Sequence, residues 1–126
     1  MTMNSTPRIL LTGAILELTL ATAFIHFTLG GTLFLLNAAG YLALGASYLI
    51  AALAPMPAIR RLSWLPRIGL AGFASVTIVA YLVVGPYFTL GWVTKGIEIA
   101  IITLVVADLL LQTDGGRASR RPPTSA

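Results

Sequence analysis

Five ionisable side chains lie inside long apolar stretches of the chain: Glu17, His26, Lys95, Glu98 and Asp108. Each such group costs about 2.5–3.5 kcal/mol on insertion into hydrocarbon, and this cost makes it a candidate for ion or proton chemistry. Lys95 and Glu98 are three residues apart, so on a helix their side chains meet on one face and neutralise each other. The pattern indicates either polar contacts that fix helix packing or an ion-linked site.

Depth along a helix, at a rise of about 1.5 Å per residue, groups several polar residues in one layer. Counted from the ends of the apolar stretches, this layer lies in the outer half of a membrane and contains His26, Asn37, Tyr41, Tyr81, Lys95 and Glu98. We expect an outer-layer polar cluster. It either holds the helices in register or forms a binding site or an ion pathway.

Glu17 falls near the middle of the first apolar stretch, about 900° of helical turn from His26 and hence on the opposite face. No cation lies at its depth. We expect this mid-membrane carboxyl to be protonated, or to bond to polar groups of other helices, as a packing contact or as a proton carrier. The candidate partners are Glu98, Tyr41, Ser75 and Thr77.

The composition places these residues in a membrane protein. Of the 126 residues, 57% are hydrophobic and 10% are charged, whereas a soluble domain has about 25% charged residues. Four apolar stretches of about 20 residues each suffice to cross a hydrocarbon core of roughly 30 Å. We expect helices at about 9–29, 32–53, 66–84 and 91–112.

The cations predict how these helices are oriented. Seven of the eight lie outside the apolar stretches, whereas the turns near Gly30 and Gly85 carry no charge. By the positive-inside rule, all seven lie in the cytoplasm. The expected fold is an all-α integral membrane four-helix bundle of two antiparallel hairpins in the cell membrane, with both termini cytoplasmic. Residues 1–8 then form a cytoplasmic N-terminal segment, and residues 113–126 a disordered cytoplasmic tail.

The N-terminus has an alternative interpretation. Arg8, the apolar run 9–20 and the small residues 21–23 resemble a cleavable secretory signal. Glu17 interrupts that run and the apolar residues continue beyond it, which favours a spanning helix. Cleavage would leave the orientation of the other three helices unchanged.

The connection at 58–67 is expected to lie at the inner interface with Trp64, opposite an outer aromatic belt of Tyr87, Phe88 and Trp92. Its arginines, Arg60, Arg61 and Arg67, are expected to contact anionic lipid heads rather than nucleic acid. Asp108 lies near the inner edge and is expected to pair with Arg67 or with an arginine of the tail.

Small residues spaced three or four apart mark faces on which helices can approach closely: Ala39, Ala43, Ser47, Gly69, Gly72, Gly96 and Ala100. These faces either pack the bundle internally or mediate self-association or docking to another membrane subunit.

Enzymatic chemistry has no support in the sequence. There is no cysteine, one histidine, no Gly-x-Ser-x-Gly sequence and no phosphate-binding glycine loop. We therefore expect a protein that is not an enzyme and holds no metal or other cofactor.

Three stretches carry a resemblance to a known group of proteins: residues 26–30 (HFTLG), 35–43 (LLNAAGYLA) and 91–98 (GWVTKGIE). The chain resembles, from about Ala23 to Leu111, small four-helix membrane proteins of unknown function from bacteria and haloarchaea. Trp92 stands where that group usually has Tyr, and Gly96 where it usually has Ala. The resemblance implies the same fold and the same outer-layer residues, and it implies no activity.

Two functions remain as expectations. The first is a non-enzymatic accessory or assembly subunit that acts through helix packing, binds membrane lipid, and forms a homo-oligomer or joins another membrane subunit. The alternative is a small oligomeric transporter, channel or proton-linked sensor that uses the buried ionisable residues.

Overall fold

The computed structural model describes residues 5–120 and 122, and within them the chain forms five helices and no strand. The helices are α1 (Ser5–Leu29), α2 (Thr32–Leu53), α3 (Pro57–Arg61), α4 (Trp64–Val84) and α5 (Thr89–Ala118). Three of them, α1, α2 and α4, are long and apolar enough to cross a membrane. The chain is thus all-helical, and its apolar helices indicate a multi-pass membrane protein.

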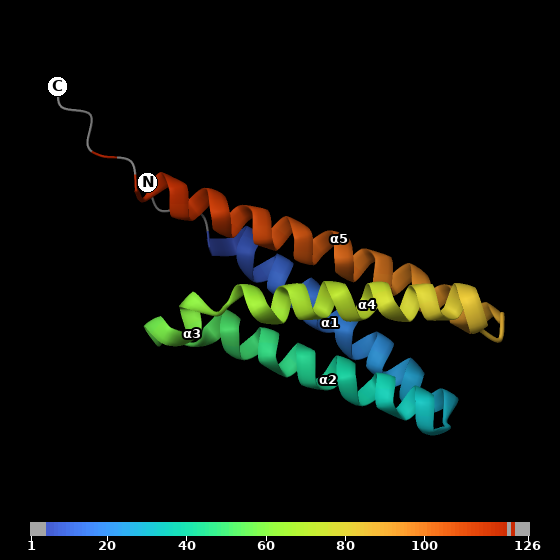
Figure 1. Cartoon of the computed structure of the whole chain (residues 1–126). Coiled ribbons are helices and arrows are strands. Elements are labelled where there is room, and N and C mark those ends of the chain that lie inside the picture. Colours follow the sequence, from blue (N-terminus) through green and yellow to red (C-terminus); the bar gives the residue numbers. More distant parts are fainter. Residues whose placement is uncertain (1–4, 121, 123–126) are drawn as a thin grey trace.

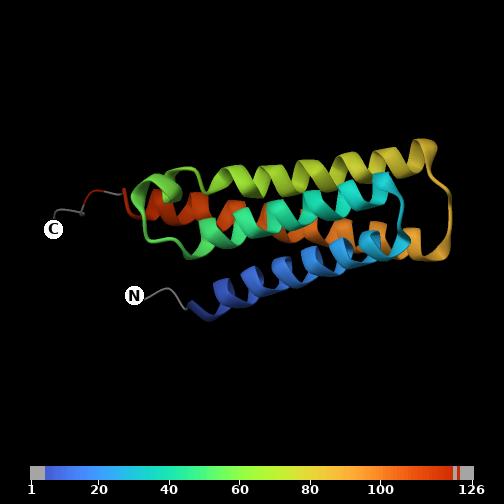
Figure 2. The same ribbon diagram turned by 90° about the horizontal axis from the view of Figure 1, so that it is seen from below.

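The four long helices lie side by side (Figures 1 and 2). α1 packs against α2 and α5, and α4 packs against the same two helices. The start of α1, the short α3 and the end of α5 lie at one end of the molecule, and the turns α1–α2 and α4–α5 lie at the other (Figure 2). Gly30 and Gly31 form the first of these turns with φ of 69° and 83°, a conformation that glycine adopts without steric cost.

The core runs the length of the molecule and includes two tyrosines, Tyr41 and Tyr48, that are fully buried. The outer surface is strongly apolar: Val84 is 78% exposed, Leu53 71% and Leu33 70%. A surface of this kind is typical of a protein whose surroundings are hydrocarbon rather than water.

Helix boundaries differ from those expected mainly at the termini. α1 begins at Ser5 and α5 continues to Ala118, so residues 113–118 are helical instead of disordered. No proline interrupts this extension, and the Thr113 hydroxyl donates to the Leu110 carbonyl within it (2.8 Å). The remainder of the expected segments, residues 1–4, 121 and 123–126, lies outside the described residues. The connection at 58–67, where a loop with a possible turn of helix is expected, contains the end of the short helix α3 and the start of α4.

The small-residue faces are turned outward rather than into the core. Most of these positions are exposed, and Gly69 and Ala100 are half-buried. Internal packing is therefore the wrong interpretation for the exposed ones, which are Ala39, Ala43, Ser47, Gly72 and Gly96.

Of the predicted glycines, Gly69 does allow a close approach inside the molecule, because a Cβ there would lie 3.0 Å from Leu44 Cδ2 of α2. Two glycines that were not predicted behave in the same way. A Cβ on Gly45 would lie 3.0 Å from Thr19 Cγ2 of α1, and one on Gly40 would clash with the ring of Phe73 in α4.

Candidate functional site

The ion pair of the outer layer forms on α5. The Lys95 ammonium donates to Oε2 of Glu98, and the two residues are only 7% and 0% exposed. The Lys95 nitrogen also lies 5.5 Å from the centre of the Tyr81 ring, a cation–π distance. The three-residue spacing thus gives a neutral pair in the interior, as the sequence predicts.

His26 approaches the same carboxylate from α1. Its Nδ1 lies 2.8 Å from the Thr22 carbonyl oxygen, and because a carbonyl can only accept, Nδ1 carries the proton. The other nitrogen, Nε2, then faces Oε1 of Glu98 at 3.9 Å. Oε1 is the one buried side-chain polar atom among the described residues that lacks a hydrogen-bond partner. This separation exceeds hydrogen-bond distance, so the two groups are close neighbours without a direct bond.

Tyr41 of α2 contacts both His26 and α4 in this layer. Its ring centre is 5.7 Å from that of His26, and its hydroxyl pairs with the Thr77 hydroxyl of α4 at 3.0 Å. Thr77 also donates to the Ala74 carbonyl at 2.9 Å, so Tyr41 is the donor in the bond between the two hydroxyls. This bond joins α2 to α4 at the depth of the ion pair.

Tyr81, also predicted for this layer, supports the turn between α4 and α5. Its hydroxyl accepts from the Phe88 N–H (3.1 Å) and donates to the Phe88 carbonyl (3.2 Å). The ring contacts Tyr87 and Trp92 edge-on, with centres 5.6 and 5.3 Å apart. The expected aromatic belt therefore packs together around Tyr81.

A cavity of about 270 Å³ lies beside the polar layer. Most of its wall comes from α2 and α4, and it is mainly apolar. Its polar lining residues are His26, Asn37, Thr77, Tyr81, Thr94 and Lys95. Asn37 is half-buried, and its relation to the predicted cluster is that it lines the same cavity. The arrangement provides buried charge next to a small space, which suits a small ligand or a proton.

A second polar group lies at the other end of the molecule. Arg67 Nε of α4 donates to Asp108 Oδ2 of α5 at 2.6 Å, and Nη1 of the same arginine donates to the Ser63 carbonyl at 2.5 Å. The Tyr48 hydroxyl donates to the same Asp108 oxygen at 3.0 Å. Asp108 was expected to pair with Arg67 or with an arginine of the tail, and the structure shows the ion pair with Arg67.

This pairing corrects one prediction for the interfacial arginines. Arg67 is 2% exposed, so it does not reach lipid heads, whereas Arg60 and Arg61 are exposed as expected. Tyr48 was not predicted. The available signal was its seven-residue spacing from Tyr41, which places both on one face of α2.

Glu17 is also placed differently from the prediction. It lies on the outward face of α1 and is exposed, whereas Thr19, Thr22 and His26 of the same helix are buried. It bonds to none of its four expected partners: Tyr41 bonds to Thr77, and the Ser75 hydroxyl donates to Ala71. The face that α1 turns inward is set by the threonines and His26, which leaves the carboxyl outside.

Within the described residues, no three His, Cys, Asp or Glu side chains come together as a metal site. Comparison of the chain with family models, with curated proteins and with solved structures gave no match.

Proposed function

We propose that this chain is a non-enzymatic subunit of the bacterial-type inner membrane. Its four long helices cross the membrane as two antiparallel hairpins with both termini in the cytoplasm. The 30 residues of α5 exceed the about 20 that a span requires. Its membrane-depth charges, Lys95, Glu98 and Asp108, are all buried in ion pairs, which leaves an apolar surface for lipid.

The cysteine-free sequence allows a direct test of this topology. Thr89→Cys lies at the turn between α4 and α5, and Ser119→Cys follows α5. In intact cells, a membrane-impermeant maleimide should label the first variant, and it should label the second only after permeabilisation. The reverse pattern would contradict the orientation.

Within this topology, we propose that the subunit acts by associating with other membrane chains, and the outward position of Glu17 carries this proposal. In an isolated copy the carboxyl would face hydrocarbon, at a cost of about 2.5–3.5 kcal/mol. A hydrogen-bonding group from another chain removes that cost. The surrounding face supports such a contact because Gly13 has open space beside it and Leu20 and Phe24 are exposed.

The outward ridge on α2 supports the same conclusion. Ala39, Ala43 and Ser47 recur every four residues on the exposed side of this helix. The Ser47 hydroxyl is already bonded to the Ala43 carbonyl at 2.8 Å, so the ridge presents small groups with no unmet hydrogen bond. A second helix can approach such a surface closely and gain van der Waals contact.

The test is purification from native membranes in mild detergent, followed by native mass spectrometry. Wild type should retain a partner chain, either a second copy or another membrane protein. Glu17→Leu and Ala43→Leu should each release it, whereas Glu17→Gln should keep it because the amide still hydrogen-bonds. Val79→Leu, at an exposed position on α4, is the matched control. A monomeric wild type without a partner would contradict the proposal.

A second candidate function rests on the unpartnered Oε1 of Glu98. This atom faces His26 Nε2 at 3.9 Å, and the adjoining cavity is lined by His26 and Lys95. A small movement that brings these two atoms within hydrogen-bond distance would allow the imidazole and the carboxylate to share one proton. That property suits a small oligomeric transporter, channel or proton-linked sensor.

This second candidate is tested by the double variant Lys95→Met/Glu98→Leu, which removes both charges together. In proteoliposomes that contain a pH-sensitive dye, wild type should dissipate an imposed pH gradient, and the folded double variant should not. Wild-type rates equal to those of protein-free liposomes would rule out proton conduction.

A further inference from the structure

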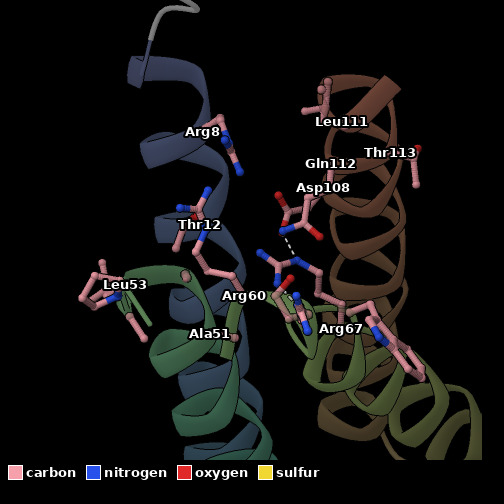
Figure 3. A pocket seen from close by; sticks show the side chains of 18 of the residues that line it. Arg8, Thr12, Ala51, Leu53, Arg60, Arg67, Asp108, Leu111, Gln112 and Thr113 are labelled. Carbon is pink, nitrogen blue, oxygen red and sulfur yellow. Dashed lines mark hydrogen bonds and ion pairs between the residues drawn. The ribbon is translucent and has the colours of Figure 1, made fainter. Parts of the chain in front are cut away.

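A large cavity lies at the end of the molecule where α1 begins and α5 ends (Figure 3). Its volume is about 1050 Å³, and every helix contributes to its wall. The polar side chains around it include Arg8, Thr12, Arg60, Arg61, Arg67 and Gln112. It is distinct from the outer-layer cluster and from the outward faces of α1 and α2.

The charges around this cavity do not balance. Four arginines line it, and one acidic residue, Asp108, lines it with them, so the lining has a net charge of +3. Arg67 already pairs with Asp108 at 2.6 Å. None of the ion pairs of the described residues involves Arg8, Arg60 or Arg61. Three cations therefore line one space, and no acidic group among the described residues forms an ion pair with them.

These cations come from two separate elements. Arg8 is on α1, and Arg60 and Arg61 are on α3. In Figure 3 the side chain of Arg8 points from α1 toward the space in front of Asp108, and Arg60 reaches toward Thr12. Guanidinium groups that converge from different elements can each donate two hydrogen bonds to phosphate oxygens.

Part of the wall is apolar and exposed at the surface of the molecule. Ile9 is 67% exposed, Leu53 71% and Leu111 48%, and all three line the cavity. Trp64, a residue type that favours the membrane interface, lines it as well. A charged space with an apolar rim at this level fits an amphipathic anion better than a fully soluble one.

We propose that this cavity binds the phosphate headgroup of an anionic phospholipid with at least two negative charges. Arg8, Arg60 and Arg61 contact the phosphate oxygens, and the acyl chains leave along Ile9, Leu53 and Leu111. The site requires this end of the molecule to lie at the inner membrane interface, as proposed above. It does not depend on association through α1 or α2, so the two proposals can fail separately.

The probe is diphosphatidylglycerol, which carries two phosphates, compared with zwitterionic phosphatidylcholine in the same detergent. Native mass spectrometry of the full chain reports how many lipids remain bound as the lipid concentration rises. We expect one diphosphatidylglycerol to bind about tenfold more tightly than phosphatidylcholine, because only the former supplies the anionic oxygens. Equal retention of the two lipids would overturn the proposal.

The variant pair that tests the site is Arg8→Gln/Arg60→Gln against Arg117→Gln/Arg120→Gln. Both doubles remove two positive charges from the same end of the molecule, but Arg117 and Arg120 do not line the cavity. The first should weaken binding about tenfold, and the second by less than about twofold, since exposed charges act weakly. Equal weakening by both would show diffuse attraction instead of a site.

Soluble phosphate is the competing source of the same chemistry. Inorganic pyrophosphate at an equal concentration should leave the lipid bound, because it has no apolar part to contact Ile9, Leu53 and Leu111. Complete displacement by pyrophosphate would overturn the assignment to a lipid. Arg8 and Arg60 are exposed and make no protein ion pair among the described residues, so circular dichroism should show the cavity variant folded.

Discussion

The two polar layers of this protein both contain a buried ion pair, but only the pair near α3, Arg67–Asp108, joins two helices. At the inner end, Asp108 accepts hydrogen bonds from Arg67 and Tyr48 through a single oxygen, and Arg67 also donates to a backbone carbonyl. In the outer layer, Glu98 accepts one hydrogen bond from Lys95 while its other oxygen has no partner and faces His26 at 3.9 Å.

This difference bears on how firmly each ion pair holds the neighbouring helices. A buried ion pair between two helices, here α4 and α5, fixes their relative position because a displacement separates the two charges. The outer pair lies within α5, and its contacts with other helices are longer: 5.5 Å from the Lys95 nitrogen to the Tyr81 ring centre on α4, and 3.9 Å from Glu98 to His26 on α1. Oε1 of Glu98 has no hydrogen-bond partner, and Lys95 lines the neighbouring cavity.

The largest effect should come from Asp108→Ala. This change leaves the Arg67 guanidinium buried without a counter-charge, which should lower the free energy of unfolding by about 3–5 kcal/mol. SDS titration of the detergent-solubilised protein measures it. Asp114→Ala, at an exposed position near the end of the same helix, should change stability by less than about 0.5 kcal/mol. Similar losses in the two variants would show that the inner pair has no special role.

Glu98→Leu should have a smaller effect, a loss of about 2 kcal/mol, because Lys95 keeps its contact with the Tyr81 ring. Adding Lys95→Met should restore most of that loss by removing the remaining charge. The same SDS titration reports both values. A double variant less stable than Glu98→Leu alone would mean that Lys95 is held by contacts other than Glu98.

The smallest expected difference is between two tyrosines of α2. Tyr48→Phe removes a hydrogen bond to a carboxylate, worth about 1.5–3 kcal/mol, whereas Tyr41→Phe removes one to a hydroxyl, worth about 0.5–1.5 kcal/mol. Thermal unfolding in one detergent should therefore give the lower Tm for Tyr48→Phe. A lower Tm for Tyr41→Phe than for Tyr48→Phe would mean that the stronger hydrogen bond lies in the outer layer.

Sequence spacing predicted much of the candidate site because depth follows directly from helix rise. The Lys95–Glu98 pair and the proximity of His26 to it were accessible in this way. Spacing could not predict the roles of Thr22, Thr77 and Tyr48. Each of these roles depends on which side chain lies opposite it in the folded structure.

The sequence by itself determined the helical class, the positions of the turns and the segregation of cations away from apolar stretches. Only the tertiary structure decided which face of each helix turns inward: Arg67 lies inside, and Glu17 and the ridge of Ala39, Ala43 and Ser47 lie outside. The physical reason is the surrounding medium. In a membrane protein both the lipid-facing and the interior side of a helix are apolar, so hydrophobic periodicity carries little information about orientation.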